Sequence, residues 1–366
     1  MFKQLKLKDF MVFKKADFTF GERLNIMIGE NGSGKTQLMK LLYALDMLSV
    51  ALPLNADRGW DGMRPQLFLD NSQASFKPSE PVGILKKLYM VHELAEMVTL
   101  GASVDKRTGV RLLKAEATMG NEGKGLTITV GTDGGLTVEG YQGSRLFVQE
   151  RQSAIFLPAR ELLTMYRNYL PLSAEYEMPY DLTFDKAIVK LGLPYKREHS
   201  PEYLKIIASL EEAIQGRIFL KDEKFYYHPD NAPLGLDFDI NMAAEGWRRL
   251  GTLTQLLRNG SLRKGMALLW DEPEANLNPR LIRLIAQTIL ELSKLDIQVF
   301  IATQSLFLVN ELEILISQQK IKEGVRFFNL RKDKTPQQGD CFSALKNVLL
   351  LDEEMKQSDR YMDEEV

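Results

Sequence analysis

The sequence contains very little cysteine and histidine and no long hydrophobic run. Cys341 is the only cysteine among 366 residues, so no intrachain disulfide can form, which fits a reducing cytoplasm. The three histidines, His92, His199 and His228, lie far apart and match no zinc-ligand spacing. No apolar run is long enough to span a bilayer, and Met1–Lys8 alternates like a strand rather than a signal peptide. We therefore expect a cytoplasmic protein with no zinc site and no contact with a membrane.

The chain also lacks an excess of either charge. Its 47 basic and 49 acidic residues give a net charge of −2. A dedicated nucleic-acid binder usually carries a marked positive charge, so the overall signature is absent, although a local basic face stays open. No internal repeat and no sustained heptad pattern occurs, which excludes long coiled-coil arms. The length allows either one large domain with insertions or two domains.

The central motif of the chain is the glycine-rich segment within Ile26–Thr36. The spacing Gly29-x-x-x-x-Gly34-Lys35-Thr36 fits a phosphate-binding loop without a mismatch. Glycine lets the backbone approach an anion closely, and the following helix start adds positive potential. We expect Lys35 to contact the β- and γ-phosphates of ATP and Thr36 to bind Mg²⁺. The predicted nucleotide-binding residues of this loop are Gly29, Asn31, Gly32, Ser33, Gly34, Lys35 and Thr36.

The residues on either side of the loop support this interpretation. Leu24, Ile26 and Ile28 alternate as in a buried strand, and leucines recur at helical spacing from Leu38 to Leu48. A chance glycine-rich turn would lack this order of strand, loop and helix. The segment therefore predicts nucleotide binding.

The rest of the chain divides by its pattern. Residues 53–81 are typical of a loop, and the alternation from Val110 to Val148 predicts an antiparallel meander. Glu161–Ile214 is mostly helical in pattern, with breaks expected near Pro171, Pro179, Pro194 and Pro201. In the final third, helix and strand patterns follow one another. The expected elements are Glu245–Arg258 (helix), Ala267–Trp270 (strand), Pro279–Leu295 (helix) and Gln298–Ala302 (strand).

A second functional motif lies at the end of the apolar segment Met266–Trp270. This buried strand is followed by Asp271 and Glu272, which should emerge at the carboxyl edge of a parallel sheet. Asp271 would hold the Mg²⁺ shell, and Glu272 would polarise the attacking water. An acidic turn after an ordinary core strand is the simpler alternative, and the phosphate loop together with the next residues argues against it.

The segment Asp271–Pro279, Asp-Glu-Pro-Glu-Ala-Asn-Leu-Asn-Pro, resembles ABC-type ATPases of the RecF, SMC and OLD group. The opening agrees with the same group, since Leu5–Phe10 precedes Leu24–Thr36 in the expected order. The resemblance implies an α/β fold, a P-loop NTPase with an ABC-type ATPase head. A mixed sheet would lie beside an antiparallel sheet, with an inserted helical lobe. Without coiled coil or nuclease domain, the chain is most similar to compact stand-alone ATPases of the bacterial phage-defence type.

The resemblance also implies a signature segment and a switch residue. Ala244, Glu245 and Gly246 occupy the signature position at a helix start, with alanine where the family usually has serine. A plain helix N-terminus, with Glu245 favourable to the helix dipole, is the alternative. The resemblance adds Asn276 to the nucleotide contacts and places Gln304 at the usual switch histidine. Glutamine cannot carry a proton, so we predict slow ATP turnover.

Several arginines have open roles at this stage. Arg160 follows the short strand Ala154–Leu157 and could link the nucleotide to the lobe, or form a surface ion pair with Glu161 or Glu150. Four further arginines give the signature helix a basic character that could meet a phosphate, a partner or solvent. They are Arg248, Arg249, Arg258 and Arg263.

Four segments are expected. They are an N-terminal ATPase part (1–160), a helical lobe (161–215), a C-terminal ATPase part (216–350) and a charged tail (351–366). The leading functional hypothesis is an ATP-dependent switch in which two copies, or a higher homo-oligomer, sandwich ATP and Mg²⁺ and act on a separate effector protein. The alternatives are a RecF-like DNA-repair ATPase that clamps DNA, a transporter ATPase subunit, and a nucleotide-sensing scaffold without activity.

Overall fold

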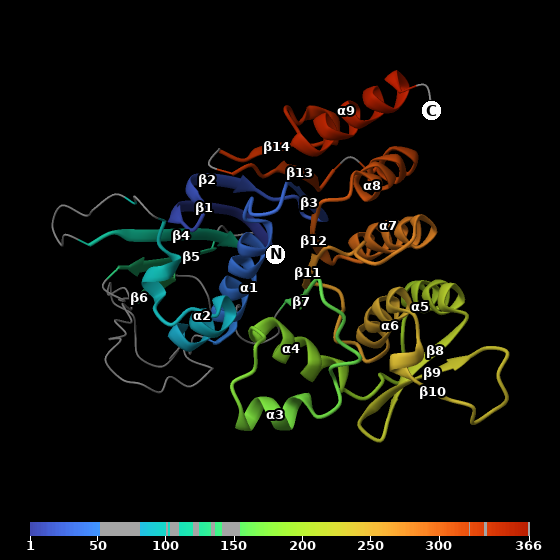
Figure 1. Ribbon diagram of the computed structural model, residues 1–366. Coiled ribbons are helices and arrows are strands. Elements are labelled where there is room, and N and C mark those ends of the chain that lie inside the picture. Colours follow the sequence, from blue (N-terminus) through green and yellow to red (C-terminus); the bar gives the residue numbers. More distant parts are fainter. Residues whose placement is uncertain are drawn as a thin grey trace.

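The computed structural model describes residues 1–51, 81–99, 102, 110–119, 124–132, 136–140, 154–321, 323–332 and 335–364. The loop expected at 53–81 and the end of the meander at Val148 therefore lie outside the described residues, apart from Pro81, and so does Glu150. Figure 1 shows a layered α/β molecule built around one central sheet.

The central sheet has six strands and combines strands from the N-terminal and C-terminal parts of the chain. Its order is β14-β13-β3-β12-β11-β7. In that order the strands span Gln337–Gly339, Val325–Asn329, Leu24–Ile28, Gln298–Thr303, Ala267–Asp271 and Ile155–Leu157. All neighbours pair in parallel except β14, which is antiparallel to β13. Strands β3, β11 and β12 are buried along their whole length, as expected for a parallel sheet covered on both faces.

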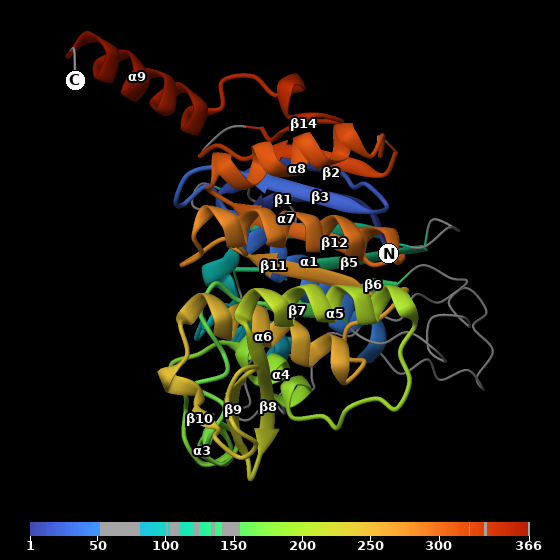
Figure 2. The ribbon, with the colours of Figure 1, turned by 90° about the vertical axis from the view of Figure 1, so that its right-hand side faces the viewer.

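Each face of this sheet has its own hydrophobic core. Alternate residues of β3 point to opposite faces, so Ile26 joins one core and Met27 the other. The Ile26 face is covered by α6 (Glu245–Arg258), α7 (Pro279–Lys294) and α8 (Leu306–Gln318), as Figure 2 shows. The Met27 face is covered by α1 (Lys35–Ala51) and by a second sheet.

The second sheet is antiparallel and has the order β2-β1-β4-β5-β6. In that order its strands span Phe13–Thr19, Phe2–Phe10, Leu112–Met119, Lys124–Gly131 and Leu136–Gly140. Helix α2 (Pro81–Tyr89) and the 3₁₀ turn η1 (Leu94–Met97) pack beside it. The mixed α/β architecture with a separate antiparallel sheet confirms the predicted fold class.

The middle of the chain adds helices α3 (Tyr169–Glu175), α4 (Leu182–Leu191) and α5 (Pro201–Ile214). The expected breaks near Pro171 and Pro201 are confirmed, because irregular segments precede α3 and α5 and each proline lies in the first turn of its helix. Proline is tolerated there, since the first N–H groups of a helix have no partner within it.

Three short strands follow, β8 (Gly216–Lys221), β9 (Lys224–Pro229) and β10 (Phe238–Asp239), and then the 3₁₀ turn η3 (Ile240–Met242). Buried side chains of α4, α5, β8 and β9 belong to the same core as the Ile26 face of the central sheet. The middle segment thus packs directly onto the sheet that carries the phosphate loop.

The last described elements are the 3₁₀ turn η4 (Phe342–Ala344) and helix α9 (Leu349–Asp363). Helix α9 extends away from the body in Figures 1 and 2, and it has no buried residue. Within the described part of the chain, no helix combines the length and apolar character needed to cross a membrane.

Candidate nucleotide-binding site

Four neighbouring strands deliver the candidate site to one edge of the central sheet. Strand β3 leads into the glycine-rich loop, β11 ends at Asp271, and β12 ends just before Gln304. Strand β7 leads to Ala159 through Pro158. Ligands of open α/β sheets bind at this carboxyl edge, so motifs far apart in sequence meet where they can share one ligand.

The loop has the backbone shape that an anion cradle needs. Gly32 and Gly34 have φ angles of +77° and +92°, in the region that favours glycine. A Cβ on Gly29 would lie 2.3 Å from the Leu330 carbonyl oxygen, so only glycine fits beside β13. The Ser33 hydroxyl is buried and has no hydrogen-bond partner among the described residues. A buried, unpartnered hydroxyl at a helix start fits a loop that binds phosphate.

Lys35 is the buried cation of this loop. Its Nζ donates hydrogen bonds to the carbonyl oxygens of Gly29 at 2.5 Å and Glu30 at 3.0 Å. Burial lowers the pKa of Lys35, and the nearby carboxylates of Asp271 and Glu272 oppose that shift. The ammonium group is therefore held against the loop that would carry the phosphates, with acids facing it from the next strands.

Thr36 and Asp271 meet directly, although 235 positions separate them in sequence. The Thr36 hydroxyl donates to Asp271 Oδ2 at 2.8 Å. Burial raises the pKa of Asp271 to about 6, and the Thr36 hydrogen bond acts in the opposite direction.

These two oxygens fit Mg²⁺, which typically uses one or two protein ligands and completes its shell with water and phosphate. The described residues contain no group of three or more His, Cys, Asp or Glu placed to hold a metal ion.

Glu272 and Gln304 also meet at this edge. Gln304 Nε2 donates to Glu272 Oε1 at 2.6 Å, and the Glu272 backbone N–H donates to the Ala302 carbonyl at 2.8 Å. Glu272 has a φ of +47°, which is uncommon outside glycine and often marks a functional residue. The carboxylate is thus fixed from two sides, by its own backbone and by the residue at the expected switch position.

Glu274 is an additional acid of the site to which sequence reasoning gave no role. Its Oε1 accepts from Thr303 Oγ1 at 2.5 Å and from the Gln304 N–H at 3.4 Å. Its Oε2 is buried without a partner among the described residues, and burial raises the pKa of Glu274. Glu274 therefore anchors the backbone that presents Gln304. The sequence did contain a signal for this role, because Glu274 is a further acid in the motif Asp271–Pro279, two positions after Glu272.

The start of α6 carries the expected signature residues. Ala244 is the exposed N-cap residue, and no side chain caps the helix. Gly246 is buried against Leu277, whose Cδ2 would lie 2.9 Å from an added Cβ. Asn276 donates from Nδ2 to Glu245 Oε1 at 2.6 Å, so the structure joins these two predicted residues to each other. Among the described residues, no hydrogen bond connects the α6 start to the phosphate loop of the same chain.

Arg249 links α6 to the strand ends. Its guanidinium donates to the Ala159 carbonyl and, at 3.4 Å, to the Glu272 carbonyl. The side chain is buried, and burial lowers its pKa. Sequence reasoning grouped Arg249 with three other arginines. The missed signal is its place on the buried face of α6, three residues after Gly246 and four before Leu253.

Two expectations about other arginines need correction. Arg160 is exposed, and the pair with Glu161 proposed for it is wrong, because Glu161 Oε2 instead lies 3.4 Å from Arg248 Nε. The packing of α6 beside the segment after β7 brings these two together. Arg258 does not contribute to the site, since it pairs with Glu211 on α5 at 2.7 Å.

The fold and this site define a P-loop ATPase domain, and sequence comparisons agree. A family model described as "AAA domain, putative AbiEii toxin, Type IV TA system" matches residues 175–310, and an AAA-domain model matches residues 4–45. The DNA replication and repair protein RecF of Oenococcus oeni is 44% identical over 43 residues, and that of Bacillus thuringiensis is 39% identical over 44 residues. Each match spans 12% of this chain and only 12% of the relative.

Solved structures extend the likeness over the whole fold. An SMC head bound to the C-winged helix domain of ScpA aligns with a TM-score of 0.58 at 13% identity, covering 94% of this chain and 99% of that chain. The Pyrococcus furiosus Smc head with an extended coiled coil, bound to the C-terminal domain of ScpA, aligns at 0.52 and 12% identity, covering 99% of each chain. At these identities the alignments show that the chain shares the fold of the SMC head.

Proposed function

We propose that this chain is an ATP-hydrolysing switch whose nucleotide-bound form joins two copies. Each phosphate loop would hold ATP against the α6 start of the other copy, where Ala244, Glu245 and Gly246 lie. The matches to AAA-domain models support nucleotide binding in general. The roles of individual residues and the pairing of two copies are our proposal.

The chemistry of the site assigns distinct tasks to its residues. Lys35 and the loop N–H groups would bind the phosphates, and Thr36 with Asp271 would hold Mg²⁺, which supplies positive charge beside them. Glu272 would accept a proton from the attacking water, and Gln304 would keep its carboxylate in place. Because Gln304 cannot carry a proton, we expect turnover to be slow, as suits a switch.

One observation carries the pairing of two copies. Helix α6 begins in solvent without a side-chain cap, and the first N–H groups of a helix have no partner within it. A side chain usually satisfies such groups, and here Ala244 cannot. An anion supplied by a second copy would satisfy them and would also meet the positive end of the helix dipole.

The test is the mass in solution of Glu272→Gln with and without ATP and Mg²⁺. The amide keeps an oxygen that Gln304 can bind but removes the base, so ATP should be trapped. We expect a monomer without nucleotide and a dimer with ATP. A monomer under both conditions, or a dimer that needs no ATP, would contradict the proposal.

A matched second variant, Glu272→Gln with Ala244→Arg, separates pairing from nucleotide binding. Ala244 is exposed, so arginine fits within one copy but obstructs the helix start against another. We expect this double variant to bind ATP as tightly as Glu272→Gln and to stay monomeric. Dimerisation as strong as in Glu272→Gln would place the contact elsewhere.

We further propose that the switch works in the cytoplasm with a separate effector in a bacterial anti-phage system. The matched family description, a putative toxin of a type IV toxin–antitoxin system, supports a bacterial system of that general kind. Plaque counts on cells that carry the gene with its neighbours should fall. The Lys35→Ala variant should restore plaque formation, and protection that survives this change would contradict a nucleotide-dependent role.

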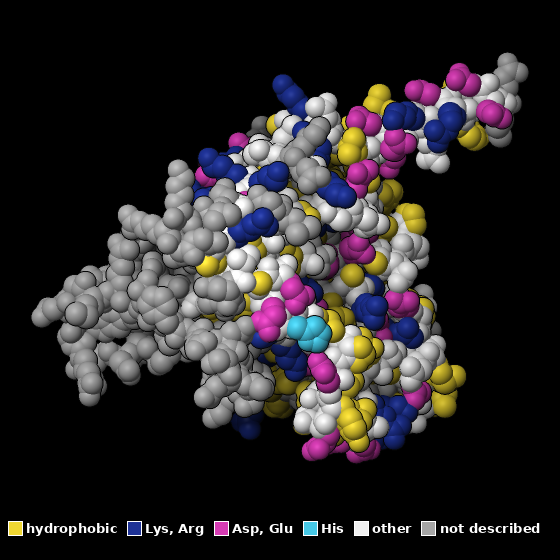
Figure 3. Space-filling view, turned by 60° about the vertical axis from the view of Figure 1, so that its left-hand side comes forward, with side chains coloured by type: hydrophobic (Ala, Val, Ile, Leu, Met, Phe, Trp, Pro, Cys, Tyr) yellow, Lys and Arg dark blue, Asp and Glu magenta, His cyan; other side chains and the backbone are white. Residues whose placement is uncertain are grey.

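A RecF-like DNA clamp is the second candidate, supported by the short matches to RecF. In Figure 3 the basic side chains of the described residues on that face lie in separate groups among acidic ones, which gives no continuous track for a phosphate backbone. DNA binding that appears only with ATP and weakens steeply with salt would favour this candidate over the effector switch.

A further inference from the structure

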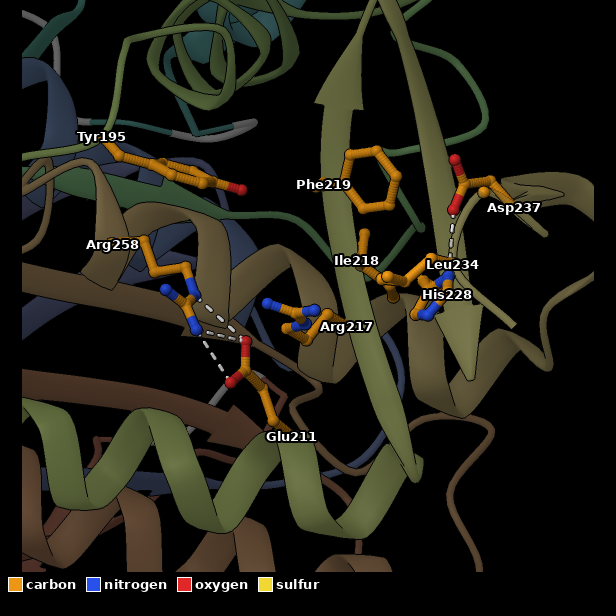
Figure 4. A pocket seen from close by; sticks show the side chains of 10 residues that line it. Tyr195, Glu211, Arg217, Ile218, Phe219, His228, Leu234, Asp237 and Arg258 are labelled. Carbon is orange, nitrogen blue, oxygen red and sulfur yellow. Dashed lines mark hydrogen bonds and ion pairs between the residues drawn. The ribbon is translucent and has the colours of Figure 1, made fainter. Parts of the chain in front are cut away.

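A cavity of about 310 Å³ lies between α5, the end of α6 and the edge strand β8, away from the nucleotide edge. Figure 4 shows Tyr195, Glu211 and Arg258 on one side of β8, and Leu234, His228 and Asp237 on the other. The Arg217 side chain extends from β8 toward the Arg258–Glu211 pair. The volume is at the lower end of the ~300–1,000 Å³ range of small-molecule pockets, so it suits a small ligand.

One arginine of this cavity is available to bind an anion. Arg258 donates to both oxygens of Glu211 at 2.7 and 2.8 Å, and His228 Nδ1 lies 3.0 Å from Asp237 Oδ1. Arg217 also lines the cavity, is exposed, and has no side-chain ion pair or hydrogen bond among the described residues. Its planar guanidinium matches a carboxylate or a phosphate.

A second arginine lines the same space. Arg258 uses Nε and Nη2 for hydrogen bonds to Glu211. The Tyr195 ring lies 5.8 Å from the Arg258 guanidinium, and its hydroxyl donates to Gln255 at 2.8 Å. An anion beside Arg217 would therefore meet one unpaired guanidinium, next to the Arg258–Glu211 pair.

The walls around these charges are apolar. Leu234 is 96% exposed and Tyr195 45% exposed, so both side chains are accessible to a ligand. Phe219 is half-buried and stacks on Tyr226 at 6.2 Å. The rings of Tyr195 and Phe219 and the branched side chain of Leu234 therefore offer apolar contacts close to Arg217.

We propose that this cavity binds a small aromatic acid. Its carboxylate or phosphate would pair with Arg217, and its ring would lie against Phe219, Leu234 and Tyr195. The site is separate from the nucleotide site, because α6 has 14 residues and spans about 20 Å at ~1.5 Å per residue between its Gly246 end and its Arg258 end. Binding here does not depend on the proposed dimerisation.

The experiment is ligand-observed NMR titration of the full chain with phenyl phosphate, benzoate and inorganic phosphate. We expect phenyl phosphate or benzoate to bind, and inorganic phosphate to bind markedly more weakly than phenyl phosphate because it makes no ring contact. Arg217→Ala should weaken the aromatic acid roughly tenfold, as for loss of a charge-assisted hydrogen bond. Leu234→Ser should weaken it as well, and an exposed leucine can be replaced without unfolding the chain.

Two controls make the result specific. Arg280→Ala removes another exposed arginine and should leave binding unchanged. Lys35→Ala disables the phosphate loop and should also leave it unchanged. The proposal is overturned if neither aromatic acid binds, if Arg217→Ala and Arg280→Ala act alike, or if Lys35→Ala abolishes binding. Equal affinity for inorganic phosphate and phenyl phosphate would overturn the claim that an aromatic ring contributes to binding.

Discussion

Gln304 is the side chain that most directly fixes Glu272 within the described site. It donates to the Glu272 carboxylate at 2.6 Å from the neighbouring strand end. We predict that Gln304→Ala lowers the ATPase kcat roughly tenfold to hundredfold, less than the ~10²–10⁴-fold that a complete general base contributes. Nucleotide affinity should change little. Steady-state kinetics and a binding titration check both, with exposed Gln319→Ala as control. An unchanged kcat would show that Glu272 needs no positioning by Gln304.

Gly29 is the glycine of the phosphate loop whose backbone surroundings leave no room for a side chain. An added Cβ would lie 2.3 Å from the Leu330 carbonyl oxygen, which is backbone and cannot rotate away. We predict that Gly29→Ala lowers the free energy of unfolding by about 1–3 kcal/mol, the usual range for overpacking. Gly246→Ala is the matched control, because its close contact is the movable end of Leu277. Urea denaturation should show a clearly smaller loss for Gly246→Ala.

The site residues found from sequence and those missed differ in how local their signal is. Lys35 and Thr36 lie in a loop whose phosphate chemistry dictates the spacing, so the motif alone points to them. Glu274 and Arg249 act through contacts with Thr303, Ala159 and other segments distant in sequence. Such contacts depend on how strands and helices pack, and no local spacing rule encodes them.

Helix α6 illustrates how well an element can be predicted and what stays hidden. Its bounds, Glu245–Arg258, agree with the helical pattern because apolar residues recur along one face. Strand β1 instead extends to Phe10, beyond the alternation of Met1–Lys8, since Phe10 pairs with Phe13 across a tight connection to β2. The alternation ends at Lys8-Asp9, and Asp9 has a φ of +56°, so sequence pattern alone ends the strand too early.

Arg249 determines how α6 is attached to the strand ends. It is 6% exposed and bonds to the carbonyls of Ala159 and Glu272. We predict that Arg249→Ala lowers the free energy of unfolding by about 2 kcal/mol, as for lost hydrogen bonds of a buried charged group. Arg249→Lys should restore little, because one ammonium cannot reproduce the planar fork.

Chemical denaturation measures the free energy of unfolding of Arg249→Ala. Arg280 is exposed, so the control variant Arg280→Ala should have a free energy of unfolding within about 0.5 kcal/mol of wild type. A loss for Arg249→Ala as small as that of Arg280→Ala would mean that the link between α6 and the strand ends contributes no stability.

At the scale of the whole molecule, the two ends of the chain fold together. Strand β3 lies between β12 and β13, which come from the last part of the sequence, and each face of their sheet has its own core. The strand order was not predictable from the sequence, because all buried parallel strands are similar apolar runs. Their residues do not indicate which strand pairs with which. Only the two motifs, at Lys35 and Asp271, indicated that β3 and β11 end at the same edge.

Helix α9 is the described element least involved in this packing. It extends from the body in Figure 3, has no buried residue, and exposes Leu351, Met355 and Met362. Stability comes mainly from buried apolar area, so removing residues 351–366 should change the thermal midpoint by no more than about 2 °C. Scanning calorimetry of the truncated and full chains checks this. Nucleotide binding should also persist, because the site lies at the edge formed by β3, β11 and β12. A large fall in the thermal midpoint would contradict this prediction. It would show that α9 packs onto the body in solution through its apolar side chains Leu351, Met355 and Met362.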